Sequence, residues 1–111
     1  MIRDIQEHLI NAILSDYGII KKLDADLFDK DLQFFVSKIN KAIDDETPIN
    51  YFVMQLENNL SKIDDLVSRI KWQDKYIDIM ARLPLIETHF DFYLLKLKEF
   101  RDMEIIKGVV R

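Results

Sequence analysis

The feature that most constrains this chain is a stripe of apolar residues that begins at Leu32. Counted from Leu32, apolar side chains recur at i+3, i+4, i+7, i+10 and i+11, the spacing that places them along one face of an α-helix. The charged residues of the same segment fall mostly off this face. The pattern predicts a helix that lies against the core, and the residues expected in the core are Leu32, Phe35, Val36, Ile39 and Ile43.

Further helical patterns occupy the rest of the chain. Apolar residues repeat at helical spacing over residues 3–15, 51–60, 61–71, 74–83 and 87–107. With 49% hydrophobic residues the chain is too apolar for disorder, and two glycines and two prolines are too few turn formers for a many-stranded sheet. We therefore predict an all-α fold, a compact bundle of about six helices with a long C-terminal helical hairpin. Residues 1–83 should form the globular body, and residues 84–111 the hairpin segment of the same single domain.

The last predicted helix carries apolar residues on two opposite sides. At about 100° per residue, one group contains Phe90, Tyr93, Leu94, Leu97, Phe100 and Ile105. A small core can cover only one side, so the second group either contacts another copy of the chain or is covered by helices that wrap around both sides. The residues predicted to mediate self-association are Phe92, Leu95, Met103 and Ile106.

Charge and composition limit the possible binding partners and the possible cellular compartment. The net charge of −4 argues against sequence-independent DNA binding, which needs a basic surface, although residues 94–111 carry a local charge of +2. No apolar run approaches the roughly 20 residues that span a bilayer, and charge follows Met1 where a signal peptide would be apolar. The absence of cysteine fits a reducing compartment. We expect a cytoplasmic protein without membrane contact and with little or no DNA contact.

The sequence lacks recognisable motifs for catalysis and for binding phosphate or metal ions. Gly18 and Gly108 stand alone, so no glycine-rich phosphate loop is present, and His8 and His89 lack metal-ligand spacing. The acidic run that begins at Asp24 has Phe28 at its fifth position and neither the glycine nor the final glutamate of a calcium loop. Helix capping explains these acids better. We predict no catalytic, metal-binding or cofactor-binding residue and no cofactor.

Four short motifs follow one another along the chain. An acidic residue opens a Leu-rich helix at residues 7–14, and a turn follows at Asp26-Leu27-Phe28-Asp29. The striped helix contains Phe35-Val36-Ser37-Lys38-Ile39, and Pro48-Ile49-Asn50 starts the next helix. In order and spacing these motifs resemble the N-terminal domain of DnaB-type replicative DNA helicases, with its Ile-Phe-Glu-Ala-Ile helix and Pro-Ile-Asp motif. The later Leu83-Pro84-Leu85-Ile86 and the helix reaching Arg101 are similar to that family's final hairpin.

Three positions depart from the family pattern. Asn50 replaces the usual aspartate, Glu46 stands where a turn glycine is common, and Leu32 occupies a position where histidine is frequent. The resemblance covers most of the chain, and these departures suggest a divergent bacterial, phage or plasmid member.

The resemblance implies a non-catalytic function in protein assembly. Domains of this family dimerise through C-terminal helical hairpins, form the N-terminal collar of a hexameric helicase, and contact primase or a loader during DNA replication. ATP hydrolysis and unwinding belong to the motor domain, so this chain would be a fragment that ends at Arg111 near the linker.

Three alternative functions remain open at this point. The first is the helicase-binding C-terminal domain of a bacterial primase, which has a similar helical body and is also non-catalytic. The second is a free-standing helical adaptor. The last is a small acid/base enzyme, for which the sequence offers no converging motif.

Overall fold

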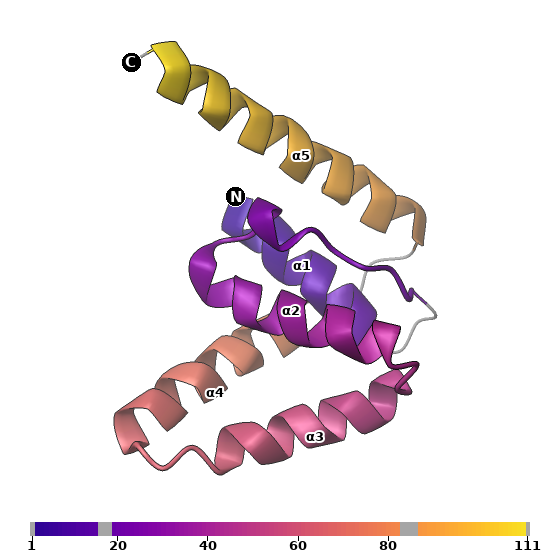
Figure 1. Cartoon of the computed structure of the whole chain (residues 1–111), viewed down its shortest axis with the longest axis vertical. Helices are drawn as coiled ribbons and strands as arrows, with labels where there is room; N and C mark the ends of the chain where they lie inside the picture. Colours follow the sequence, from indigo (N-terminus) through magenta and orange to yellow (C-terminus); the bar gives the residue numbers. More distant parts are fainter. Residues whose placement is uncertain (1, 16–18, 83–86, 111) are drawn as a thin grey trace.

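The structure, a computed structural model, describes residues 2–15, 19–82 and 87–110, with side chains in the last range from Thr88 to Met103. Its described residues are helical and contain no strand, which confirms the predicted all-α class. The radius of gyration, 14.7 Å, compares with about 13 Å expected for a compact chain of this length. The elements are α1 (Ile2–Leu14), the 3-10 helix η1 (Ala25–Leu27), α2 (Lys30–Asp44), α3 (Ile49–Ser61), α4 (Leu66–Met80) and α5 (Glu87–Val110) (Figure 1).

Helix α1 lies at the centre of the molecule. It packs against all four of the other α-helices, with α5 on one side of it and the α3–α4 pair on the other (Figure 1). Its side chains from Leu9 to Ile13 are almost completely buried, and the polar Gln6 and Asn11 are buried with them. Asn11 is satisfied because its amide Nδ2 donates to the carbonyl oxygen of Ile79 at 2.9 Å. This bond fixes the end of α4 against α1.

The stripe on α2 faces the core. Leu32, Phe35, Val36 and Ile39 have no exposed surface, whereas Ile43 is only partly buried. One polar residue on this helix, Asn40, anchors the segment before η1 through hydrogen bonds with the backbone N–H and carbonyl oxygen of Leu23, at 2.9 and 2.6 Å. The irregular residues 19–23 are therefore attached to α2.

The helix count differs from the prediction at α4. Residues 61–71 and 74–83 were expected to form two helices with a cap at Asp74, but one continuous helix runs from Leu66 to Met80. Asp65 caps it, because its carboxylate accepts a hydrogen bond from the Ser68 N–H at 3.0 Å. No glycine or proline interrupts residues 66–80, so Asp74 remains inside the helix. The described residues thus form five α-helices and η1, against about six helices expected.

The C-terminal segment consists of one long helix in the described residues. Helix α5 has 24 residues, about 36 Å at 1.5 Å per residue, and it packs on α1 and η1. Its C-terminal end extends past the rest of the molecule (Figure 1). Of the segment 84–111, residues 84–86 and Arg111 lie outside the described residues.

Candidate functional site

The inner face of α5 is buried against α1. Phe90 and Leu97, two turns apart, have no exposed surface, and Tyr93 and Leu94 are half-buried beside them. The ring of Tyr93 stacks with the imidazole of His8 at a centroid distance of 6.3 Å. Phe100 was predicted on this side, yet 44% of its surface is exposed, because it lies at the border of the buried face rather than at its centre. One side of α5 thus belongs to the core.

The opposite side of α5 is apolar and exposed. Phe92, Leu95 and Met103 expose 55%, 53% and 57% of their surface, although all three are large apolar side chains. Their spacing of i, i+3 and i+11 aligns them along one line of the helix. We call these three residues the outer face of α5. The fourth residue predicted for self-association, Ile106, lies outside the described side chains.

A charged pair interrupts the outer face, because Lys96 and Glu99 follow Phe92 at i+4 and i+7 on the same side of the helix. The ammonium of Lys96 lies 5.4 Å from the ring centroid of Phe92, and it pairs with the carboxylate of Glu99 at 3.2 Å. Both charged residues are exposed, so the pair stands between the apolar side chains without burying them. The outer face therefore combines exposed apolar side chains with one charged pair, a mixture that protein contacts commonly have.

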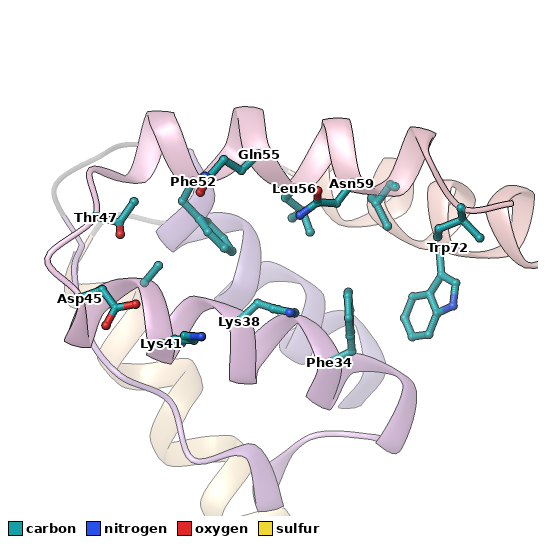
Figure 2. Close-up of a pocket in the computed structure, with 13 residues that line it drawn as sticks. Phe34, Lys38, Lys41, Asp45, Thr47, Phe52, Gln55, Leu56, Asn59 and Trp72 are labelled. Carbon is teal, nitrogen blue, oxygen red and sulfur yellow. The ribbon is translucent and has the colours of Figure 1, made fainter.

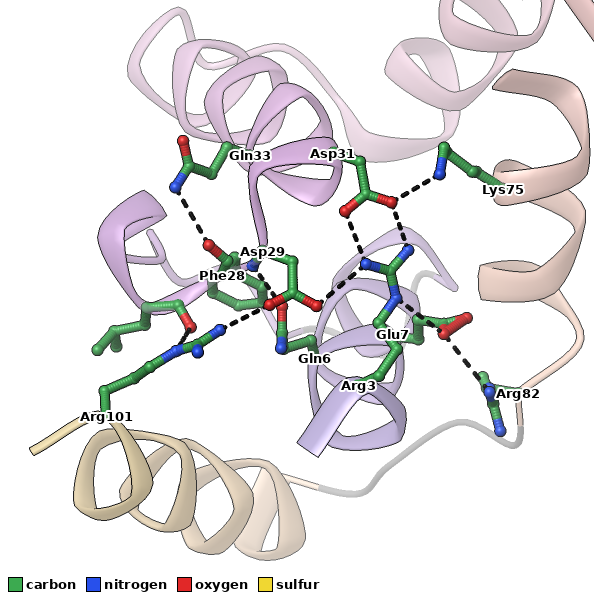
Figure 3. A network of polar contacts seen from close by, with 11 residues as sticks. Arg3, Gln6, Glu7, Phe28, Asp29, Asp31, Gln33, Lys75, Arg82 and Arg101 are labelled. Atoms are coloured by element: carbon green, nitrogen blue, oxygen red, sulfur yellow. Dashed lines mark hydrogen bonds and ion pairs between the residues drawn. The ribbon is translucent and has the colours of Figure 1, made fainter. Parts of the chain in front are cut away.

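Arg101 fixes α5 in this orientation (Figure 3). Its Nε donates to the carbonyl oxygen of Leu27 at 2.8 Å, and its Nη2 donates to Asp29 Oδ1 at 2.9 Å. These two bonds attach α5 to η1 and to the start of α2. Arg101 follows Leu97 at i+4, so it lies on the same side of α5 as the buried Phe90 and Leu97.

Asp29 belongs to a polar network that joins four helices (Figure 3). The guanidinium of Arg3 makes two hydrogen bonds of 2.7 Å to the carboxylate of Asp31 and one of 3.1 Å to Asp29. Lys75 of α4 donates to Asp31 as well, at 2.6 Å. The network therefore connects α1, the start of α2, α4 and α5.

The network holds its carboxylates in the charged form. Hydrogen bonds from Arg3 keep the pKa of Asp31 well below its ordinary value, against the opposing effect of partial burial. At Asp29, burial alone would raise the pKa, but hydrogen bonds from Arg101 and Arg3 outweigh it and lower the pKa. A carboxylate that stays ionised and bound to cations is a poor proton donor near neutral pH. The network therefore acts as a structural connection between the helices.

The acidic run near η1 is divided between capping and ion pairing. Asp24 accepts a hydrogen bond from the Asp26 N–H at 3.0 Å, and Asp29 and Asp31 belong to the network. Among the residues that the structure describes, no group of three or more His, Asp or Glu side chains converges to hold a metal ion. No helix within the described ranges has the length and apolar character needed to span a membrane.

Sequence reasoning did not find the polar network. The partners of its principal contacts are separated by 26, 28, 44 and 72 positions, so no local motif reports them. The only signal was the run of aspartates before α2, and its cationic partners cannot be assigned without the fold.

Comparison of this chain with models of protein families, with curated proteins and with solved structures finds no match.

Proposed function

We propose that this chain is a non-catalytic protein-interaction module that self-associates through the outer face of α5. The observation that carries the proposal is the exposure of Phe92, Leu95 and Met103 on a helix whose opposite side is already buried. Leaving such a strip in water is unfavourable, since burying a large apolar side chain contributes on the order of 1.5 to 3 kcal/mol. A second copy of α5 offers the same apolar strip and would cover it.

The finer form of this proposal assigns the module to DNA replication. We propose that it acts as the N-terminal domain of a DnaB-type helicase, in the cytoplasm of a bacterium or of a phage or plasmid host. Its support is the order of the motifs from residue 7 to Pro48-Ile49-Asn50. In this assignment α5 supplies one helix of the dimerising hairpin, the assembled collar is a hexamer, and primase or a loader is the partner.

The first test is the association state of the isolated chain. Three or four half-exposed side chains give a modest gain, and association costs an estimated 4 to 15 kcal/mol, so we expect a weak, concentration-dependent dimer. Leu95→Glu should weaken the dimer, because it places an unpaired carboxylate in an apolar contact. In sedimentation, the variant should stay monomeric up to a concentration at least tenfold higher than wild type does. Circular dichroism should show that the variant keeps its helices, since Leu95 is exposed.

A matched control is Val67→Glu, which makes the same kind of change at an exposed apolar residue of α4. It should leave the dimer intact. A wild type that stays monomeric at millimolar concentration, or a dimer lost only in Val67→Glu, would contradict self-association through α5. For the finer assignment, a Walker-type motor encoded directly after Arg111 supports the helicase, and a primase domain encoded before Met1 supports the alternative.

A further inference from the structure

A groove lies on the side of the molecule away from α5. It has a volume of about 440 Å³ and is bordered by α2 and α3, with Trp72 of α4 at one end (Figure 2). The residues at its base are apolar and include Phe52, Leu56 and Leu60, which are also part of the core. The groove is therefore an extension of the hydrophobic core that is open to solvent.

The two edges of the groove run along helices and are polar except at the aromatic Phe34. On α2, Phe34, Lys38 and Lys41 follow one another at i, i+4 and i+7, which covers about 10 Å along the helix axis. On α3, Gln55 and Asn59 stand at i and i+4. An apolar base between two parallel polar edges matches an elongated ligand with one apolar side, as an amphipathic helix has.

One end of the groove carries exposed aromatic surface. The ring of Phe34 lies 4.8 Å from the indole of Trp72, and both residues retain contact with solvent. Trp72 is held by the buried Phe35, at a centroid distance of 5.8 Å. A fixed aromatic pair next to an apolar base is suited to receive a large apolar side chain, the type of residue that anchors protein contacts.

The α2 edge of the groove is cationic. Within the described ranges neither Lys38 nor Lys41 forms an ion pair, and the ammonium of Lys38 lies 5.7 Å from the ring of Phe34. Asp45, which directly follows the last residue of α2, lies at the far end of the groove (Figure 2). Two unpaired lysines on a chain of net charge −4 form a local positive edge, which favours carboxylates on the ligand.

From these features we infer that the groove binds an amphipathic helix of a partner protein, with its apolar side on the groove base and acidic side chains facing Lys38 and Lys41. A second copy of this chain is the competing occupant, because its outer face of α5 carries Glu99, already paired with Lys96, and the exposed Asp102. The test below distinguishes the two occupants. Helices α1 and α2 separate the groove from α5, so self-association and partner binding can occur together (Figure 1).

The experiment uses two synthetic helical peptides of about 16 residues, roughly 24 Å long, with the same Leu and Phe stripe. One carries Glu beside the stripe and the other carries Lys. Fluorescence anisotropy of labelled peptide gives affinity, and Trp72, the single tryptophan of the chain, reports contact at the groove. We expect the Glu peptide to bind at least tenfold more tightly than the Lys peptide and to change Trp72 emission, with the difference decreasing at high salt.

The double variant Lys38→Glu, Lys41→Glu should lose this preference or reverse it. Both lysines are exposed, so the fold should be kept. Lys98→Glu, an exposed lysine on α5, is the matched control and should bind like wild type. Leu95→Glu should also bind like wild type, which separates this inference from self-association.

Three results would overturn the inference. The first is that the two peptides bind with equal affinity, or that neither binds at millimolar concentration. The second is binding without any change in Trp72 emission, which would place the peptide elsewhere. The third is a loss of self-association in the double lysine variant with peptide binding unchanged, which would mean that the groove holds a second copy of the chain.

Discussion

Glu46 has a backbone conformation that favours glycine. Its φ of 56° lies in the left-handed region, and it is the non-glycine residue with positive φ among the residues described. This conformation closes α2, because the Glu46 N–H donates to the Ile43 carbonyl oxygen at 3.1 Å and the Thr47 N–H donates to that of Ala42 at 2.9 Å. Both bonds belong to the Schellman motif, in which glycine normally follows the helix.

Glu46→Gly should therefore stabilise the fold. A side chain in the left-handed region costs about 1 to 2 kcal/mol, and the added freedom of glycine in the unfolded chain offsets about 0.4 to 1 kcal/mol of the gain. We expect a net increase of about 0.5 to 1 kcal/mol in the free energy of unfolding, measured by urea denaturation. Glu46→Ala keeps Cβ, and with it the cost of the left-handed conformation, while it removes the charged group from the C-terminal end of α2. If alanine stabilises as much as glycine, the charge near the helix end is the cause and the backbone explanation is wrong.

At the scale of the helix, α2 offers the clearest test of the core. Phe35 and Ile39 have no exposed surface and lie one turn apart on the buried face. Truncating either side chain to Ala should cost about 2 to 5 kcal/mol through lost burial and the cavity left behind. Met54→Ala, at an exposed position of α3, should change stability by less than about 0.5 kcal/mol. Losses as small as this at both α2 positions would show that the buried face has been misassigned.

A structural element can be predicted from the sequence when the contacts that define it lie close together in the chain. The stripe from Leu32 to Ile43 was sufficient for α2, because the spacing of apolar residues is a local property. At α4 the possible cap at Asp74 predicts two helices, but no glycine or proline lies around it and the segment forms one continuous helix. The side of α5 that faces the core follows from the spacing of Phe90 and Leu97, but its attachment by Arg101 could not be predicted, because the partners of Arg101 lie 72 and 74 positions away. The groove likewise depends on how α2, α3 and α4 meet, which no single segment encodes.

At the scale of the whole molecule, α1 separates two surfaces of different character. The outer face of α5 carries exposed apolar side chains with the Lys96–Glu99 pair between them, whereas the groove between α2 and α3 combines an apolar base with the cationic edge of Lys38 and Lys41. Because the two surfaces lie on opposite sides of α1, occupation of one does not obstruct the other (Figure 1). A self-associating chain would then present at least two grooves to its partners, and linked binding events of this kind raise the overall affinity.

The polar network that joins the helices makes the fold sensitive to acid. In the folded chain the pKa values of Asp29 and Asp31 lie below their ordinary values, mainly because of hydrogen bonds from Arg3 and Arg101. In the unfolded chain the pKa of an aspartate is about 3.9. A lowered folded pKa adds stability that is fully present above the unfolded pKa and is lost as the pH falls through the folded pKa. The network should therefore stabilise the protein at neutral pH and lose this contribution progressively below about pH 4.

Asp31→Asn tests this sensitivity, because it removes one of the two carboxylates without changing the size of the side chain. Since Asp31 is partly exposed, we expect a loss of about 1 to 2 kcal/mol at pH 7 and a smaller difference from wild type at pH 3, measured by urea unfolding at each pH. Asp26→Asn makes the same chemical change at an exposed residue outside the network, and it should follow the wild-type pH profile. A deficit in Asp31→Asn that stays constant from pH 7 to pH 3 would contradict the argument, because the unfolded chain protonates this aspartate at about pH 3.9 while the folded chain keeps it ionised, so the difference must shrink below about pH 4.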